Sequence, residues 1–210
     1  MENLAARFGG RTVFERVGFE VRRGEVFVIL GGSGCGKSTL LKHMIGLYQP
    51  AEGRIEVPLE EHTDLPAEAR ALVARAKLGL VGLADAAGRL PAEISGGMAK
   101  RAGIARAMAL DPPILFLDEP SAGLDPITSA GLDALITQLA RELGTTFVVV
   151  THELQSILAI GDRCIMLDKA AKGMIAEGDP RRLRDESTDP TVRAFFRREA
   201  PPDGGAAGGA

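Results

Sequence analysis

The sequence has no long apolar run. Its longest unbroken stretches of aliphatic and aromatic residues cover residues 26–30, 114–117 and 147–150. A membrane-spanning helix needs roughly 20 predominantly apolar residues. We therefore predict that no segment of the chain crosses a bilayer.

Cysteine is scarce, and positive charge is not in excess. The 210 residues include two cysteines, Cys35 and Cys164, and the formal net charge is −3 at pH 7. Two distant cysteines and the lack of a signal-peptide pattern in MENLAARFGG favour a reducing compartment, so we expect the protein in the cytoplasm. Because no global positive field is present, we expect no nucleic-acid partner.

The three apolar runs show no polar alternation, which is typical of strands covered on both faces in a parallel sheet. Apolar residues recur at helical spacing in residues 37–47, 96–110 and 127–143. This succession predicts an α/β fold with a mainly parallel sheet. Further short strands are expected in RTVFERVGFEV and GRIEV, as a small antiparallel subdomain, and in RCIMLD and GMIAEG.

The length predicts one domain, which we place at residues 1–198. The last ten residues, PPDGGAAGGA, carry no apolar side chain larger than Ala or Pro. Such a segment cannot offset its own ordering entropy. We expect residues 199–210 to be a disordered tail.

A glycine-rich loop follows the first apolar run. In VFVILGGSGCGKST a strand leads into Gly31-x4-Gly36-Lys37-Ser38 and then a helix, the context that a phosphate-binding loop requires. Glycines let backbone N–H groups converge on phosphate oxygens, and the helix N-terminus and Lys37 add positive charge. Ser38 is expected to ligate Mg²⁺, and Cys35 is either a packing residue or a thiol activated by the helix N-terminus. The predicted nucleotide-binding residues of this loop are Gly31, Gly32, Ser33, Gly34, Cys35, Gly36, Lys37, Ser38 and Thr39.

Acidic and imidazole side chains follow the other two runs. After ILFL, Asp118 would hold Mg²⁺ through water, and Glu119 would orient or deprotonate the attacking water. After FVVVT comes His152, which is either an ordinary surface histidine or a γ-phosphate contact that helps to place the water. Guanine-specific proteins with this loop usually read the base through an Asn-Lys-x-Asp segment, and the only asparagine here is Asn3. ATP is therefore the favoured nucleotide.

The segment Ile94-Ser95-Gly96-Gly97-Met98 opens a helical run, and Ser95 is an expected N-cap. These five residues resemble the signature sequence of ATP-binding-cassette (ABC) ATPases. The order of the motifs agrees with that family: the loop at 31–38, the signature at 94–98, ILFLDE at 114–119, SAGLDP at 121–126 and His152.

The resemblance implies a dimer and a set of roles. Two copies of the chain would face each other head to tail, with Ser95, Gly96 and Gly97 of one copy closing on the ATP held by the other. Asp125 would cross the dimer interface and couple the two nucleotide sites. Glu119 and His152 are the implied catalytic residues. The implied adenine contact is Phe8, with an ordinary core or surface phenylalanine as the alternative.

The chain resembles one branch of the family in particular, the ATPases of Mla-type phospholipid and organic-solvent-resistance transporters. The resemblance lies in three segments: GGSGCGKSTLLKHMIGL, PAEISGGMAKRAGIARAMAL and FLDEPSAGLDPITS. The likeness extends over about residues 7–197 and includes Met98, where most ABC proteins carry glutamine. It implies a peripheral ATPase on the cytoplasmic face of the inner membrane. This subunit would dock on an integral membrane permease and energise phospholipid transport.

The sequence departs from the family between GRIEV and PLEEHTDLP, where relatives place several dozen more residues with a Q-loop glutamine. The absence of the glutamine predicts poorly coupled hydrolysis. The absence of the other residues predicts that the core has one strand pairing less than in relatives and that the helical subdomain is shortened. Two alternatives stay open: a degenerate or truncated ABC ATPase that binds ATP, and a soluble ABC protein outside transport. One cassette without a heptad run or basic stripe disfavours the second. A P-loop kinase would leave SAGLDP and the signature without a role.

Overall fold

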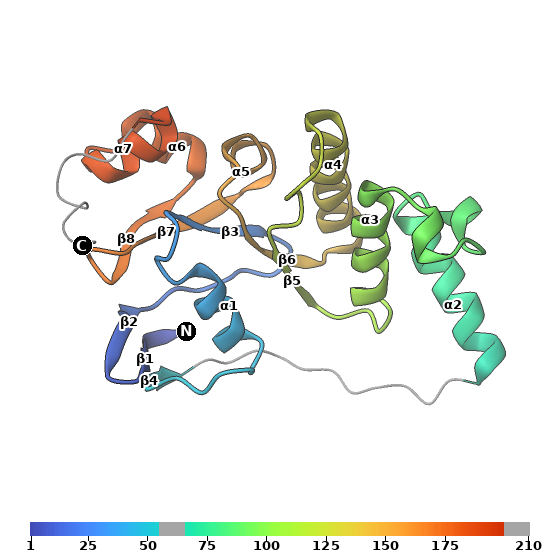
Figure 1. The fold of residues 1–210 in the computed structure, drawn as a ribbon, viewed down its shortest axis with the longest axis horizontal. Coiled ribbons are helices and arrows are strands. Elements are labelled where there is room, and N and C mark those ends of the chain that lie inside the picture. Colours follow the sequence, from blue (N-terminus) through green and yellow to red (C-terminus); the bar gives the residue numbers. More distant parts are fainter. Residues whose placement is uncertain (55–65, 200–210) are drawn as a thin grey trace.

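The computed structural model describes residues 1–54 and 66–199. A five-stranded sheet in the order β5-β6-β3-β7-β8 lies at its centre (Figure 1), and all neighbouring strands in it are parallel except β7 and β8. Its strands are β3 (Val26–Gly31), β5 (Ile114–Asp118), β6 (Thr146–Val150), β7 (Arg163–Asp168) and β8 (Gly173–Gly178). The predicted α/β class and mainly parallel sheet are confirmed.

Helices cover both faces of this sheet (Figure 1). Successive side chains of a strand point to opposite faces, so an unbroken apolar strand has apolar side chains to bury on both. Ile29 shares one buried cluster with Leu40 of α1, whereas its neighbours Val28 and Leu30 share another with α5 and α7. Phe147 of β6 belongs to a third buried cluster with α3 and α4. The longer helices are α1 (Lys37–Met44), α2 (Ala67–Leu80), α3 (Gly96–Ala107), α4 (Pro126–Leu143) and α7 (Pro190–Arg197), and the shorter ones are α5 (Leu154–Ile160) and α6 (Pro180–Glu186).

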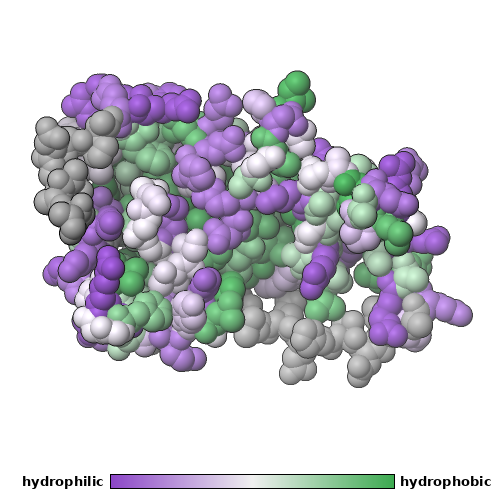
Figure 2. Space-filling view, in the orientation of Figure 1, coloured by the Kyte–Doolittle hydropathy of each residue, from purple (hydrophilic) through white to green (hydrophobic). Residues whose placement is uncertain are grey.

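The two central strands and the edge strand differ in burial. β3 and β6 are buried along their whole length, as predicted for strands covered on both faces. In β5 the side chains of Ile114, Phe116 and Leu117 are only half-buried. In the space-filling view, hydrophobic residues reach the surface between α1 and α3 (Figure 2). The prediction that the strand is buried on both faces is therefore wrong for β5. This strand is at the edge of the described sheet, with β6 beside it on one side.

A second, antiparallel sheet has the order β2-β1-β4, from β1 (Glu2–Phe8), β2 (Arg11–Val17) and β4 (Glu52–Arg54). The strand predicted in RTVFERVGFEV is confirmed as β2, and GRIEV continues beyond residue 54, outside the described residues. β1 escaped prediction because its buried residues Leu4, Ala5 and Ala6 are consecutive rather than alternating. Asn3 has a left-handed φ of 47° there, and the pairing with β2 shifts register after Leu4.

Two further expectations concern the C-terminal tail and membrane-spanning segments. The predicted disorder of residues 199–210 falls almost wholly outside them and stays a prediction. Among the helices of residues 1–54 and 66–199, none combines the length and the apolar composition that a bilayer crossing requires.

The buried position of Phe147 yields a stability prediction. Phe147 is fully buried in β6, so Phe147→Ala removes a ring that neighbouring helices cannot replace. We expect a loss of about 3–5 kcal/mol in the free energy of unfolding, measured by urea denaturation. The control is Leu72→Ala on α2, a side chain 71% exposed, for which a change within about 0.5 kcal/mol is expected. Similar losses in the two variants would contradict the described core.

Candidate functional site

The predicted phosphate-binding loop joins β3 to α1. Gly31 has φ 144°, and a Cβ added there would lie 2.2 Å from the backbone oxygen of Leu167, so the close approach of β3 and β7 requires glycine. Gly36, with φ 102°, is the N-cap of α1 and offers no side-chain cap. The N–H groups of the first helical turn therefore have no side-chain acceptor and can bind an anion.

The Lys37 ammonium lies over the same loop. Its Nζ donates hydrogen bonds to the backbone oxygens of Gly31 and Gly32 at 2.9 and 3.0 Å. A phosphate group in the loop would offer charged acceptors in their place, and hydrogen bonds between charged groups are stronger. Cys35, by contrast, is a packing residue: burial raises the pKa of its thiol, although the charge of Lys37 acts in the opposite direction.

The two predicted Mg²⁺ ligands, Ser38 and Asp118, lie close together beside this loop. Ser38 Oγ lies 3.4 Å from Asp118 Oδ1 at the end of β5. Mg²⁺ is commonly held by one or two protein oxygens together with substrate phosphates and water. No group of three or more His, Cys, Asp or Glu in the described part of the chain could hold a metal by itself. The pair therefore fits a metal shared with a nucleotide rather than a cage made by the protein.

Glu119 and His152 form the next pair at this edge. His152 Nδ1 lies 2.7 Å from Glu119 Oε1, and the side chains are 69% and 28% exposed. Glu119 has a left-handed φ of 47°, and its backbone N–H donates to the Val150 oxygen at 2.8 Å. The pairing of β5 with β6 fixes this turn, so a carboxylate and an imidazole reach solvent side by side. Such a pair can orient water and accept a proton.

The signature residues begin α3. Ser95 is its N-cap, and its Oγ accepts a hydrogen bond from the Met98 N–H at 3.2 Å, which confirms the predicted cap. The atom nearest to a Cβ added at Gly96 belongs to Leu124, whereas a Cβ added at Gly97 would lie 2.4 Å from Cγ2 of Thr128. In this chain the signature glycines thus face the start of α4.

Asp125 is the N-cap of α4. It accepts hydrogen bonds from the N–H groups of Ile127 and Thr128 and from the Thr128 hydroxyl. The Thr128 hydroxyl, and then these backbone groups, hold the pKa of the Asp125 carboxyl below its usual value. Thr128 therefore connects Asp125 with Gly97, a link that sequence reasoning missed because the two motifs are about thirty residues apart.

Two more residues near the site were not predicted. Lys100 Nζ on α3 donates to the Glu119 backbone oxygen at 3.4 Å, which ties the signature helix to the end of β5. Tyr48 lies edge-on to Phe8 with ring centroids 5.4 Å apart. Phe8 at the end of β1 is 47% exposed and Tyr48, which follows α1, is 37% exposed, so the two rings form an exposed aromatic pair. The only feature of the sequence that could have pointed to Tyr48 is that it is the single tyrosine of the chain.

The loop and the side chains at this edge of the sheet are those of a P-loop nucleoside triphosphatase. Comparisons with known proteins identify the family within this class. The family profile described as ABC transporter matches residues 14–70 and 58–122 in two overlapping segments. The "Intermembrane phospholipid transport system ATP-binding protein MlaF" of Escherichia coli K12 is 35% identical over 93% of this chain and 87% of its own length. The chain belongs to the ABC transporter family as an ATP-binding subunit.

Two other relatives are similar to the chain at nearly the same identity, and one of them has a different name. The Haemophilus influenzae MlaF is 33% identical over 95% of this chain and 90% of its own length. The "Probable ribonucleotide transport ATP-binding protein mkl" of Mycobacterium leprae is 34% identical over 93% of this chain and 67% of its own. None of these matches tests the expected absence of a Q-loop glutamine, which stays a prediction.

Solved structures agree in fold. Clostridium perfringens cbiO1, part of the ABC transporter complex cbiONQ, has a TM-score of 0.80 at 24% identity and covers 88% of this chain and 89% of its own. A dimeric ATP-binding cassette, MJ0796 bound to ADP and Pi, has a TM-score of 0.71 at 26% identity and covers 85% and 97%.

The contact of Gly97 with Thr128 can be tested by substitution. Gly97→Ala places a methyl group against Cγ2 of Thr128, so we expect a loss of about 1–3 kcal/mol in the free energy of unfolding. Thr128→Ser removes that methyl group and should recover most of the loss in the double variant. Gly96→Ala, whose nearest neighbour would be 3.8 Å away, is the matched control. Thermal and urea denaturation of all four variants measure the coupling, and additive effects would show that the two residues do not touch.

Proposed function

We propose that this chain hydrolyses ATP as the energising subunit of a phospholipid transporter. The observation that carries the ATPase part is the meeting of Lys37, the Ser38–Asp118 pair and the Glu119–His152 pair at one edge of the sheet. Phosphoryl transfer needs a phosphate cradle, a metal site and a group that places water, and its catalysis is mostly positioning and charge stabilisation.

The proposed roles follow from the geometry of each group. The loop residues, from Gly31 to Thr39, bind the ATP phosphates through backbone N–H groups, with Lys37 adding a full charge. Ser38 and Asp118 would hold Mg²⁺, and the ion would supply charge neutralisation at the phosphate oxygens. Glu119 orients the attacking water and receives its proton. His152 holds the Glu119 carboxylate at 2.7 Å and would contact the γ-phosphate of a bound ATP.

A second copy of the chain completes the proposed site. Within one chain the glycines Gly96 and Gly97 face α4, and the Glu119–His152 pair is open to solvent. A head-to-tail partner would bring Ser95 and the N–H groups of its α3 N-terminus to the γ-phosphate, as helix N-termini bind anions. Asp125, at the start of α4, would then lie at the interface. The dimeric cassette MJ0796 supports this arrangement by likeness.

The transported substrate is proposed from relatives. The two MlaF proteins are named for intermembrane phospholipid transport and are matched over most of their length. The mkl proteins are named for ribonucleotide transport at similar identity, so that class is the second candidate. In both cases the subunit would dock on a membrane permease at the cytoplasmic face of the inner membrane. Lipid transport is favoured because the match covers 87–90% of MlaF and 67% of mkl.

The dimer can be tested by slowing hydrolysis. Glu119→Gln keeps the shape of the side chain but removes the carboxylate that receives the proton, so ATP should persist in the site. We expect the variant with Mg-ATP to elute as a dimer in size-exclusion chromatography with light scattering, and the variant with Mg-ADP as a monomer. A monomer at saturating Mg-ATP would contradict the composite site.

Binding and hydrolysis should separate in two further variants. Lys37→Ala should abolish ATP binding to the isolated chain, because the loop loses its full positive charge. Ser95→Ala should leave that binding nearly intact and lower the ATPase rate about 10²–10³-fold, by analogy with loss of one preorganised donor. Equilibrium titration with an ATP analogue and a phosphate-release assay measure the two effects. Loss of monomer binding in Ser95→Ala would show that the serine acts within its own chain.

The predicted lack of a Q-loop glutamine bears on coupling rather than on these groups. The described residues give no support for impaired hydrolysis, since the loop, the Ser38–Asp118 pair and the Glu119–His152 pair are all present. A wild-type ATPase rate typical of the family would remove the degenerate ABC protein as an alternative.

A further inference from the structure

Two bridges join the turn after β5 to the turn after β6. In the first, His152 Nδ1 lies 2.7 Å from Glu119 Oε1. In the second, Ser121 Oγ donates a hydrogen bond to Glu153 Oε2 at 2.5 Å. His152 and Glu153 are neighbours in the sequence, and only Pro120 separates the other two residues. The two bridges therefore connect the same two short segments.

The two bridges differ in their exposure to water. The side chains of His152 and Glu119 are 69% and 28% exposed, and water weakens a contact between such groups. Ser121 is 4% exposed, and it donates to the carboxylate of Glu153, which is half-buried. Hydrogen bonds to charged groups are stronger than neutral ones, and more so where water is excluded. The bridge from Ser121 to Glu153 is therefore the stronger of the two.

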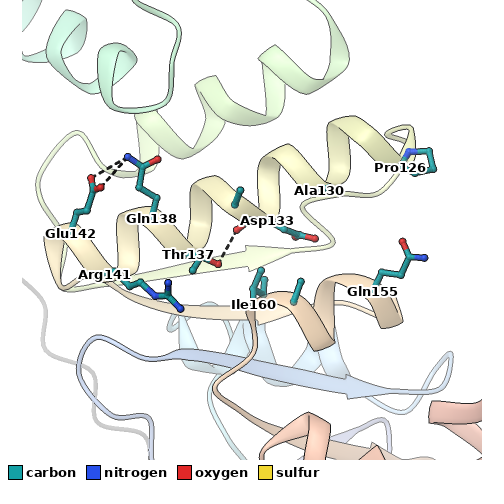
Figure 3. A pocket seen from close by; sticks show the side chains of 11 residues that line it. Pro126, Ala130, Asp133, Thr137, Gln138, Arg141, Glu142, Gln155 and Ile160 are labelled. Carbon is teal, nitrogen blue, oxygen red and sulfur yellow. Dashed lines mark hydrogen bonds between the residues drawn. The ribbon is translucent and has the colours of Figure 1, made fainter.

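The Glu153 carboxylate also contacts α4 and α5. Ser129 Oγ on α4 and Ser156 Oγ on α5 lie 3.4 and 3.5 Å from Glu153 Oε2. The Ser156 hydroxyl has one hydrogen, and its shorter contact is with Asp133 Oδ2 at 2.7 Å, so it contributes little to holding Glu153. Figure 3 shows α4 and α5 beside each other, with Asp133 on the first and Gln155 on the second. The SAGLDP segment, through its first serine, is thus the main partner of Glu153.

The backbone carries the position of Glu153 to the preceding residue. The Glu153 N–H donates to Thr151 Oγ1 at 3.1 Å, and its backbone oxygen accepts from the Ile157 N–H at 3.0 Å, in the first turn of α5. Thr151 is fully buried. The residues on both sides of His152 are therefore fixed, and a displacement of Glu153 would move the imidazole away from Glu119.

We propose that Glu153 is a positioning residue for hydrolysis, which through its bridge to Ser121 holds His152 against Glu119. This proposal rests on the proposed ATPase function, in which Glu119 orients the attacking water. The exposed contact between the imidazole and Glu119 is too weak to keep its own geometry, and the buried bridge one residue away supplies the missing constraint. Glu153 acts through His152 in this role and makes no contact with the nucleotide.

Steady-state ATPase kinetics of the whole chain with Mg-ATP test the proposal. Glu153→Ala should lower kcat about 10–100-fold, since a misplacement of about 1 Å at a reacting group can cost about 10²-fold. Its affinity for a non-hydrolysable ATP analogue should change less than about twofold, because the phosphate-binding loop is untouched. Ser121→Ala breaks the bridge from the other side and keeps the carboxylate. It should also lower kcat, and it decides the test if Glu153→Ala does not fold.

A double variant asks whether the effect passes through the imidazole. His152→Ala alone should lower kcat at least as much as Glu153→Ala does. Added to His152→Ala, the Glu153→Ala substitution should lower kcat by less than about a further twofold, because the group that it positions is already gone. A contribution of Glu153 to the fold alone would instead lower kcat by the same factor in both backgrounds.

Two substitutions on α5 are the matched controls. Ser156→Ala removes the buried hydrogen bond to Asp133 and leaves the bridge from Ser121 to Glu153 in place. Gln155→Ala changes an exposed side chain next to it. Below the unfolding temperature, both variants should keep kcat within about twofold of the wild type.

The possible outcomes separate this proposal from the proposed function. Equal losses of kcat in Ser156→Ala and Glu153→Ala would show a general effect on the fold and overturn the proposal. An undiminished effect of Glu153→Ala in the His152→Ala background would overturn it too. A kcat that depends on Glu119 and His152 but not on Glu153 would overturn the positioning role alone. A wild-type kcat that Glu119→Gln leaves unchanged would contradict the proposed function as well.

Discussion

The parallel pairing of β5, β6, β3 and β7 is the constraint on which the rest of the structure depends. Parallel strands end at one common edge, so the loop after Gly31, the Asp118–Glu119 turn and His152 emerge together although about 120 residues of sequence separate the first from the last. The backbone bond from Glu119 N–H to the Val150 oxygen fixes two of these segments directly. A slip of one residue in that register would turn the carboxylate to the other face of the sheet.

Helix α4 connects three features that look separate in the sequence. Its N-terminus is capped by Asp125, its first turn carries the Thr128 methyl group against Gly97, and its side facing α5 carries Asp133. Because α4 contacts both α3 and α5, a displacement of α4 would act on the signature helix and on α5 together. This is a physical basis for communication between the proposed nucleotide site and the outer surface.

Hydrogen bonds of polar side chains connect several of the sequence motifs. The hydroxyls of Ser121 and Ser129 both donate to Glu153 Oε2, and Lys100 reaches the Glu119 backbone oxygen. Ser121, Ser129 and Ser156 are all buried. Hydrogen bonds in such a setting are strong when paired and costly when not, so networks of this kind favour one arrangement of the loops over others.

The sequence by itself determined the α/β class, the central strands, the glycine-rich loop between β3 and α1 and the N-cap at Ser95, because these depend on local patterns: apolar runs, glycine spacing and a serine before a helix. The tertiary structure alone decided that β5 is at the edge of the sheet within residues 1–54 and 66–199, that β1 pairs with β2 through irregular register, and that Tyr48 lies beside Phe8. It also decided that Thr128 joins Gly97 to Asp125 and that the buried Oδ1 atom of Asp133 has no hydrogen-bond partner among the described residues. Each of these depends on contacts between segments far apart in the chain, and no local spacing encodes which distant groups will meet.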